Sequence, residues 1–75
     1  MDIVFEIKEK LGTITAFDTG WNKELNIVAW NGNEPRFDIR SWDSVHERMS
    51  RGLTLSTQEA EMVYRLLRGY FQESE

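Results

Sequence analysis

Three tryptophans and five basic residues fall in the middle of the chain, between residues 21 and 51. Nucleobases stack on indole rings for about 1–3 kcal/mol per base, and Lys or Arg side chains pair with the phosphates of a nucleic acid. A surface for single-stranded nucleic acid needs both residue types. The candidate binding residues are Trp21, Lys23, Trp30, Arg36, Arg40, Trp42, Arg48 and Arg51. Against this interpretation, a tryptophan in so short a chain is more often a core residue than a binding platform.

The segment 35–42, PRFDIRSW, predicts how some of these residues are arranged. Alternate side chains of an extended strand share a face. One face would therefore carry Arg36, Asp38, Arg40 and Trp42. Phe37 and Ile39 would point the other way, into a core. Asp38 lies between the two arginines, where it can hold them as an ion-pair partner. We expect an exposed face with two guanidinium groups beside an indole.

The other two tryptophans are less well defined by the sequence. If residue 30 pairs with residue 36, Trp30 joins the arginine face; if residue 31 pairs with residue 36, it turns to the opposite face, because a slip by one residue reverses every side chain. Both registers remain open. Trp21 and Lys23 lie at the start of the same predicted strand, on the rim of the surface, where ordinary loop packing explains Trp21 equally well.

The sequence offers little for catalysis or metal binding. Asp43, Ser44 and His46 are the residue types of a catalytic triad, but neighbours on one loop rarely converge as nucleophile, base and orienting acid. His46 is the only histidine and cysteine is absent, so a transition-metal site would depend on carboxylates. No glycine-rich phosphate loop is present. We expect no enzymatic activity, no metal and no cofactor.

The net charge of −4 argues, taken alone, against a nucleic-acid-binding protein. The charge is uneven, however: residues 1–20 and 53–75 are acidic, whereas basic and acidic residues are equal in number between 21 and 52. Positive charge can therefore collect on one face of the middle segment. The sequence shows neither a signal peptide nor a run of about 18 apolar residues that could span a membrane. We expect a cytoplasmic protein without membrane contact, which could associate with the nucleoid.

Alternating β-branched and aromatic residues predict four strands. We expect them at residues 3–17, 23–31, 36–42 and 53–55. Gly12 interrupts the first, which is either one long strand with a bend or bulge, or two short strands. Residues 18–20 and the pair Asn31 and Gly32 predict turns, the second closing a hairpin. Residues 43–52 predict a loop that could contain a helical turn.

A helix follows the last predicted strand. Ser56 and Glu59 form a capping box, in which each side chain bonds the free backbone amide of the other. Beyond it, apolar residues recur at spacings of three and four: Ala60, Met62, Val63, Tyr64, Leu66, Leu67, Tyr70 and Phe71. This apolar sector is wider than contact with one sheet requires, so part of it should meet another molecule. The fold class is α+β: one domain over residues 1–75, with a four-stranded antiparallel meander and one C-terminal helix.

The run GWNKELNIVAWNGNEPRFDIRSW, followed by RGLTLS and a helix, resembles the positive-cofactor-four (PC-four) family of transcriptional coactivators. The likeness is strongest to its small bacterial branch of YdbC-like proteins and covers about residues 4–72. Its most specific pieces are residues 38–40 with the tryptophan that follows them, and residues 51–55 leading into the helix. The Ser- and Lys-rich regulatory arm of the eukaryotic branch has no counterpart in this sequence.

The resemblance implies a homodimer in which the helices and sheet edges pair, while curved sheets of both subunits form grooves for single-stranded DNA. Binding in such a family shows little sequence preference, and proteins of the transcription apparatus are further partners of its eukaryotic members. Arg40 would take the position of a DNA-contacting arginine and Trp42 that of a nearby aromatic residue. Lys23, Arg36 and Arg51 resemble basic positions of the groove.

We therefore expect a dimeric, non-enzymatic protein that binds single-stranded DNA. A protein-interaction module is the alternative from another class, because tryptophan and arginine also dominate the binding energy of protein interfaces. Single-stranded RNA is a third alternative, since stacking and phosphate contacts do not distinguish the two sugars. The sequence leaves open whether the helix closes a dimer or a larger ring.

Overall fold

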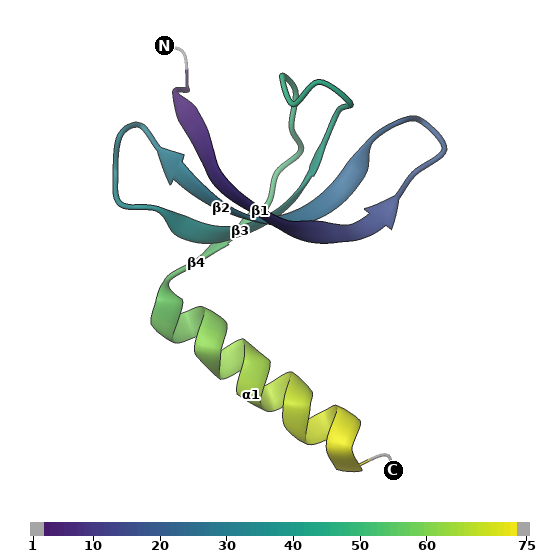
Figure 1. Cartoon of the computed structure of the whole chain (residues 1–75), viewed down its shortest axis with the longest axis vertical. Helices are drawn as coiled ribbons and strands as arrows, with labels where there is room; N and C mark the ends of the chain where they lie inside the picture. Colours follow the sequence, from purple (N-terminus) through teal and green to yellow (C-terminus); the bar gives the residue numbers. More distant parts are fainter. Residues whose placement is uncertain (1–2, 74–75) are drawn as a thin grey trace.

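Four antiparallel strands form one open sheet, and a single helix follows them (Figure 1). The computed structural model describes residues 3–73. Its elements are β1 (Phe5–Ala16), β2 (Asn22–Trp30), β3 (Arg36–Trp42), β4 (Leu53–Leu55) and α1 (Thr57–Glu73). The strands are ordered β1-β2-β3-β4, so each pairs with its neighbour in sequence. The predicted fold class is confirmed, and the third and fourth strands have the predicted bounds.

The sheet is strongly curved. Figure 1 shows both ends of the sheet bending to one side, with the helix on the other. We call these two sides the concave face and the convex face. Three register shifts in the pairing of β1 with β2 accompany the bend, and one of them lies between Lys10 and Gly12. Bulges of this kind increase the twist and bending of a strand. The first predicted strand is thus one long strand with bulges, rather than two short ones.

The β2–β3 hairpin fixes which side chains reach the concave face. Asn31 (φ 53°) and Gly32 (φ 74°) both adopt the left-handed conformation expected for this turn. Val28 pairs with Arg36 and Asn26 with Asp38. Because alternate residues share a face, Trp30 lies on the same face as Val28 and Arg36. The observed pairing therefore decides between the two possibilities left open by the sequence, and it places Trp30 on the same face as the arginines of β3.

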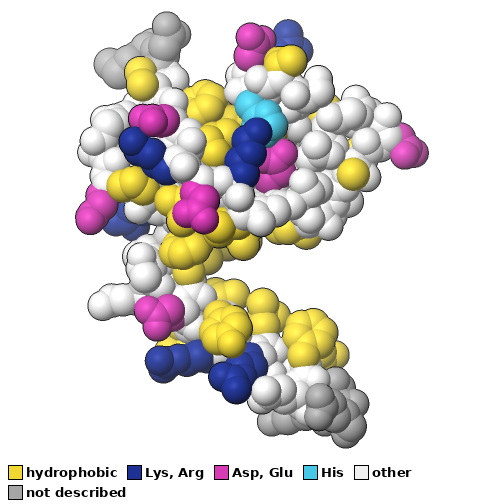
Figure 2. All heavy atoms as spheres, viewed as in Figure 1, with side chains coloured by type: hydrophobic (Ala, Val, Ile, Leu, Met, Phe, Trp, Pro, Cys, Tyr) yellow, Lys and Arg dark blue, Asp and Glu magenta, His cyan; other side chains and the backbone are white. Residues whose placement is uncertain are grey.

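The convex face and the helix enclose an apolar groove of about 500 Å³. The sheet lines it with Leu25, Phe37, Ile39 and Leu55, and the helix with Ala60, Val63, Tyr64 and Leu67 among others. Figure 2 shows hydrophobic side chains along the side of the helix that faces the sheet and basic ones along the opposite side. Within the described residues, α1 contacts only β3 and β4. Leu66 and Tyr70 remain 67% and 68% exposed, so this chain alone does not cover the apolar sector of its helix.

The helix begins as the capping box predicts. The Glu59 amide donates to Ser56 Oγ (3.1 Å), and the Ser56 amide donates to Glu59 Oε1 (2.9 Å). The hydrogen bond from the Ser56 backbone, and less strongly the charge of Arg36, hold the pKa of Glu59 below its ordinary value. No helix within residues 3–73 combines the length and apolar character needed to cross a bilayer.

Gly52 allows the chain to pass close to β3 just before β4 begins. A Cβ atom at this position would approach both Arg40 Cβ and the Ile39 carbonyl oxygen to 2.5 Å. Because one of these atoms belongs to the backbone, it cannot rotate away. The absence of a side chain at residue 52 thus lets the loop pack against Arg40.

We predict that Gly52→Ala lowers the free energy of unfolding by about 1–3 kcal/mol, the usual cost of forcing extra atoms into a packed site. Urea denaturation at fixed protein concentration measures this change. Gly12→Ala is the matched control, because no atom lies within 4 Å of a Cβ built there. Equal effects of the two substitutions would contradict the close packing of Gly52.

Candidate nucleic-acid interface

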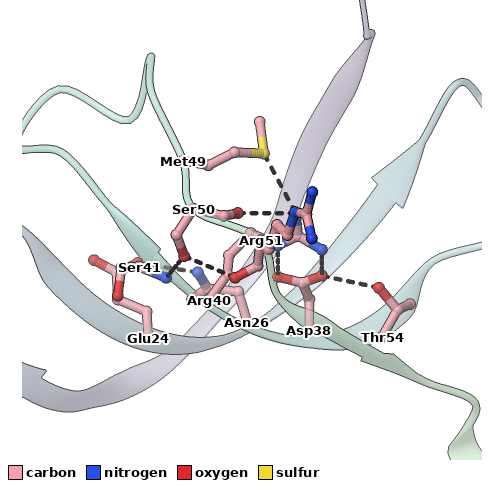
Figure 3. A network of polar contacts seen from close by, with 9 residues as sticks. All are labelled: Glu24, Asn26, Asp38, Arg40, Ser41, Met49, Ser50, Arg51 and Thr54. Atoms are coloured by element: carbon pink, nitrogen blue, oxygen red, sulfur yellow. Dashed lines mark hydrogen bonds and ion pairs between the residues drawn. The ribbon is translucent and has the colours of Figure 1, made fainter.

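A buried ion pair lies at the centre of the concave face (Figure 3). The Asp38 side chain is 0% exposed and that of Arg40 is 13% exposed. Arg40 Nε donates to Asp38 Oδ1 and Nη2 donates to Oδ2, both at 2.7 Å, and Thr54 Oγ1 donates to Oδ2 at 3.1 Å. Two parallel bonds fix the plane of the guanidinium group. The ion-pair role predicted for Asp38 is confirmed for Arg40.

Trp30 lies against this fixed guanidinium group. Arg40 Cζ is 4.4 Å from the centroid of the Trp30 ring, a cation–π contact. Trp30 is partly exposed, at the end of β2 beside the hairpin. Phe5 of β1 packs near the same indole, with ring centroids 5.9 Å apart. The structure thus places a partly exposed indole of defined orientation on the concave face.

The expectation that Trp42 is exposed is wrong. Trp42 does share its face with Arg40, as strand alternation predicts, but it is 0% exposed. Phe5 and His46 cover the indole, with ring centroids 5.1 Å and 5.6 Å from that of Trp42. On a flat sheet this face would meet solvent; on this curved sheet, β1 and the loop after β3 close over it. Trp42 is therefore part of the core in this structure.

A polar cluster beside Trp42 joins β2 to the loop after β3. His46 Nε2 lies 3.0 and 3.1 Å from the two Glu24 carboxylate oxygens, and because a carboxylate only accepts, Nε2 donates. Asn26 Nδ2 donates to Glu24 Oε1 at 3.0 Å. Burial raises the pKa of Glu24, but hydrogen bonds from Asn26 and His46, with the charge of Lys10, outweigh it and bring the pKa below 4.5. The Nε2 atom of His46 therefore points to Glu24.

The four remaining basic candidates are exposed, but they do not all share one face. Lys23 and Arg51 line a shallow groove of about 330 Å³ together with Arg40 and Ser41. Arg36 lies on the concave side by its pairing with Val28, and its charge reaches Glu59 at the start of the helix. Arg48 lies on the loop after β3, where its amide donates to Asp43 Oδ1 at 3.1 Å. The structure brings Lys23 and Arg51 together and leaves Arg36 and Arg48 on separate segments.

Trp21 lies immediately before the first residue of β2. It is partly exposed, and its carbonyl oxygen accepts a hydrogen bond from the Phe17 amide at 2.8 Å. Its predicted place at the rim of the sheet is consistent with this position. Its role in binding stays a prediction.

Sequence reasoning overlooked the part that β2 plays in the site. From the sequence, His46 was considered as a catalytic or metal-binding residue, and Glu24 and Asn26 only as part of the predicted strand at residues 23–31. A usable signal was present: Glu24 and Asn26 alternate with apolar residues in β2, as Asp38 and Arg40 do in β3. Two strands with polar residues at matching alternate positions indicate a polar layer between them. The position of His46 could not be anticipated, because it depends on a left-handed backbone conformation (φ 58°).

We predict that the stabilising contribution of Glu24 disappears in acid. Its pKa in the folded chain lies below 4.5. The contribution is therefore fully present above that pH and is lost as the pH falls through the lowered pKa. Glu24→Gln should lower the free energy of unfolding by about 1–3 kcal/mol at pH 7. This difference should shrink towards pH 3 in urea denaturation at fixed protein concentration. A constant difference over that range would contradict the assignment.

The amino-acid sequence is similar to that of a bacterial protein and matches a described protein family. An uncharacterized protein of Treponema pallidum (strain Nichols) is 34% identical over 58 residues, which cover 77% of this chain and 68% of that protein. Residues 17–65 match the family described as Transcriptional Coactivator p15 (PC4), and this range contains β2, β3, β4 and the first half of α1. Membership in that family indicates nucleic-acid binding. The chain belongs to the Transcriptional Coactivator p15 (PC4) family.

Proposed function

We propose that this protein is a homodimer that binds single-stranded DNA on the concave face of its sheet, with little preference for sequence. The observation that carries the proposal is the Trp30 indole held against the guanidinium group of Arg40, which Asp38 in turn holds by two 2.7 Å hydrogen bonds. The protein acts by binding, without catalysis, metal or cofactor. Its role in the cell lies in transcription, in keeping with the family.

Stacking on Trp30 supplies the contact with the bases. An indole that is already oriented loses little conformational entropy when a base stacks on it. Every base presents a π face, so stacking on one ring is tolerant of sequence. Arg40 is satisfied by Asp38, so its main contribution is to orient the indole rather than to neutralise a phosphate. Trp42, which is buried, has no part in this contact.

Exposed cations supply the contacts with the phosphates. Arg36 lies on the concave side, Arg48 on the loop after β3, and Lys23 and Arg51 border one groove at the end of β3. The three arginines give a path for the backbone from the hairpin to the loop. Strand alternation places Lys23 on the convex side, and it joins the path through the groove that it shares with Arg40 and Arg51. The acidic N-terminal and C-terminal segments repel phosphates, and so favour approach of the DNA to the basic path.

The second copy of the chain is proposed to cover the convex face. The groove between sheet and helix is lined almost entirely by apolar side chains, and Tyr64 and Leu67 on its helix wall remain 60% and 52% exposed. A contiguous apolar surface of this kind is costly in water. Pairing of two such faces buries both and leaves the two concave faces free.

We predict that binding of oligo-dT of about twenty bases quenches the tryptophan fluorescence at low salt. Four exposed cations per subunit give a slope of log affinity against log salt concentration of about −3, at about −0.7 per phosphate contact. Fluorescence titration between low and physiological salt measures both quantities. Oligo-U of the same length tests the alternative that the protein binds single-stranded RNA. That alternative predicts tighter binding of oligo-U than of oligo-dT.

Substitutions of Trp30 distinguish base stacking on this residue from electrostatic attraction between the basic side chains and the phosphates. Trp30→Leu should weaken binding about 5- to 150-fold, the range that corresponds to the loss of one stacked base, whereas Trp30→Phe should retain most of the affinity. Arg65→Ala on the opposite side of α1 is the control for charge. Affinity that does not change with salt, or that is equal in the Leu and Phe variants, would rule out this mode of binding.

We predict that Leu67→Asp converts the dimer into a monomer, because the new carboxylate would be buried in the apolar interface. Light scattering should give twice the chain mass of 8.9 kDa for the parent protein and the single mass for the variant. Gln58→Asp is the matched control, since Gln58 lines a different pocket with Arg65 and should leave the dimer intact. A parent protein of single mass at micromolar concentration would refute the dimer.

A further inference from the structure

The His46 ring occupies a site whose chemistry suits a nucleobase. Its centroid lies 5.6 Å from that of Trp42, with 35° between the ring planes. Its Nε2 is within 3.1 Å of both Glu24 carboxylate oxygens. A nitrogen heterocycle thus lies against an indole and donates a hydrogen bond to an acidic side chain. The His46 side chain is 22% exposed, so this site opens to solvent, and Figure 2 shows the histidine at the surface beside a basic and an acidic side chain.

The wall of this site is rich in acceptors that are incompletely used. Glu24 is 6% exposed and Asn26 is 1% exposed. Asn26 Nδ2 donates to Glu24, and its Oδ1, although buried, has no hydrogen-bond partner among residues 3–73. Within the same described range, the buried Trp42 Nε1 also lacks a partner. Buried polar groups without partners cost free energy, and native proteins keep few of them. The unpaired acceptor and the two carboxylate oxygens together suit a ligand that carries N–H donors.

His46 adopts an unfavourable backbone conformation in this loop while its ring contacts Glu24. His46 has a φ of 58°, in the left-handed region that is unfavourable for a residue with a Cβ atom. The loop is anchored separately by Asp43, whose Oδ1 accepts hydrogen bonds from the amides of Glu47 (2.8 Å) and Arg48 (3.1 Å). A ligand that replaces the contacts with Glu24 would therefore allow His46 to relax while Asp43 still holds the loop in place.

We propose that His46 stands in for a nucleobase in the free protein, and that a guanine of the bound strand displaces it and bonds Glu24. This proposal rests on the proposed function. Guanine is the base that fits best, because its adjacent N1–H and N2–H groups match the two oxygens of a carboxylate. Thymine offers one N–H between two carbonyl oxygens, which the carboxylate repels. The strand is thus held without regard to sequence elsewhere and with a base preference at this one position.

The first test measures the affinity of oligo-dT carrying one central dG, dA, dC or dT. The dG oligonucleotide should bind severalfold more tightly than the dT one, and Glu24→Gln should remove the difference. His46→Asn tolerates the left-handed backbone and removes the ring. It should tighten binding of the dG oligonucleotide by about tenfold. This is the effect expected if the His46 ring occupies the site in about nine-tenths of the free molecules, because only the remaining tenth can bind the base. Val45→Asn at the neighbouring position, which is 65% exposed, is the control and should have no effect.

The second test uses the imidazole NMR signals of the unmodified protein, in which His46 is the only histidine. Saturation with the dG oligonucleotide should move these signals to the values of a solvent-exposed histidine. Unchanged signals at saturation would overturn the displacement of His46 and leave single-stranded DNA binding standing. Equal affinity for all four oligonucleotides would overturn the guanine assignment. Failure of every oligonucleotide to bind would refute the proposed function itself and this inference with it.

Discussion

The carboxylate of Asp38, buried in the middle of the sheet, is the constraint on which the concave face depends. A buried carboxylate needs a charged and hydrogen-bonded partner, and removal of that partner typically costs about 3–5 kcal/mol. Arg40 meets this need with two 2.7 Å bonds and thereby loses its freedom to rotate. The fixed guanidinium group then orients Trp30 by a cation–π contact. One ion pair between alternate residues of β3 therefore determines the geometry of the proposed stacking surface.

The curvature of the sheet separates two kinds of chemistry. Its concave face holds polar side chains joined by hydrogen bonds, Asp38 with Arg40 and Glu24 with Asn26, and the aromatic rings of Phe5, Trp30 and Trp42 lie among them. Its convex face is apolar and continues onto the helix, which within residues 3–73 contacts only β3 and β4 of the sheet. A chain of this length buries too little surface to cover both faces. The concave face is completed from within, by the loop that carries His46, and we propose that a second chain completes the convex face.

Strand alternation predicted much of this arrangement. Alternation in PRFDIRSW correctly predicted that Arg40 and Trp42 share one face and that Phe37 lies on the other. The capping box at Ser56 correctly predicted where the helix begins. Exposure could not be predicted in the same way, because it depends on how far the sheet bends and on what the following loop covers. Trp42 was therefore assigned to the surface and is in fact buried. Trp30 could be placed only when the β2–β3 pairing was known, since the hairpin sequence allows two registers.

Photocrosslinking tests the central claim most directly. Oligo-dT in which bromodeoxyuridine replaces some thymidines reacts on irradiation with aromatic side chains that stack on its bases, and mass spectrometry of the digested protein identifies the residue. We predict that the crosslink falls on Trp30, and that residues of α1 carry none. A crosslink confined to the helix, or to the apolar residues of the convex face, would show that the strand binds elsewhere and would contradict the role of the Asp38–Arg40–Trp30 arrangement.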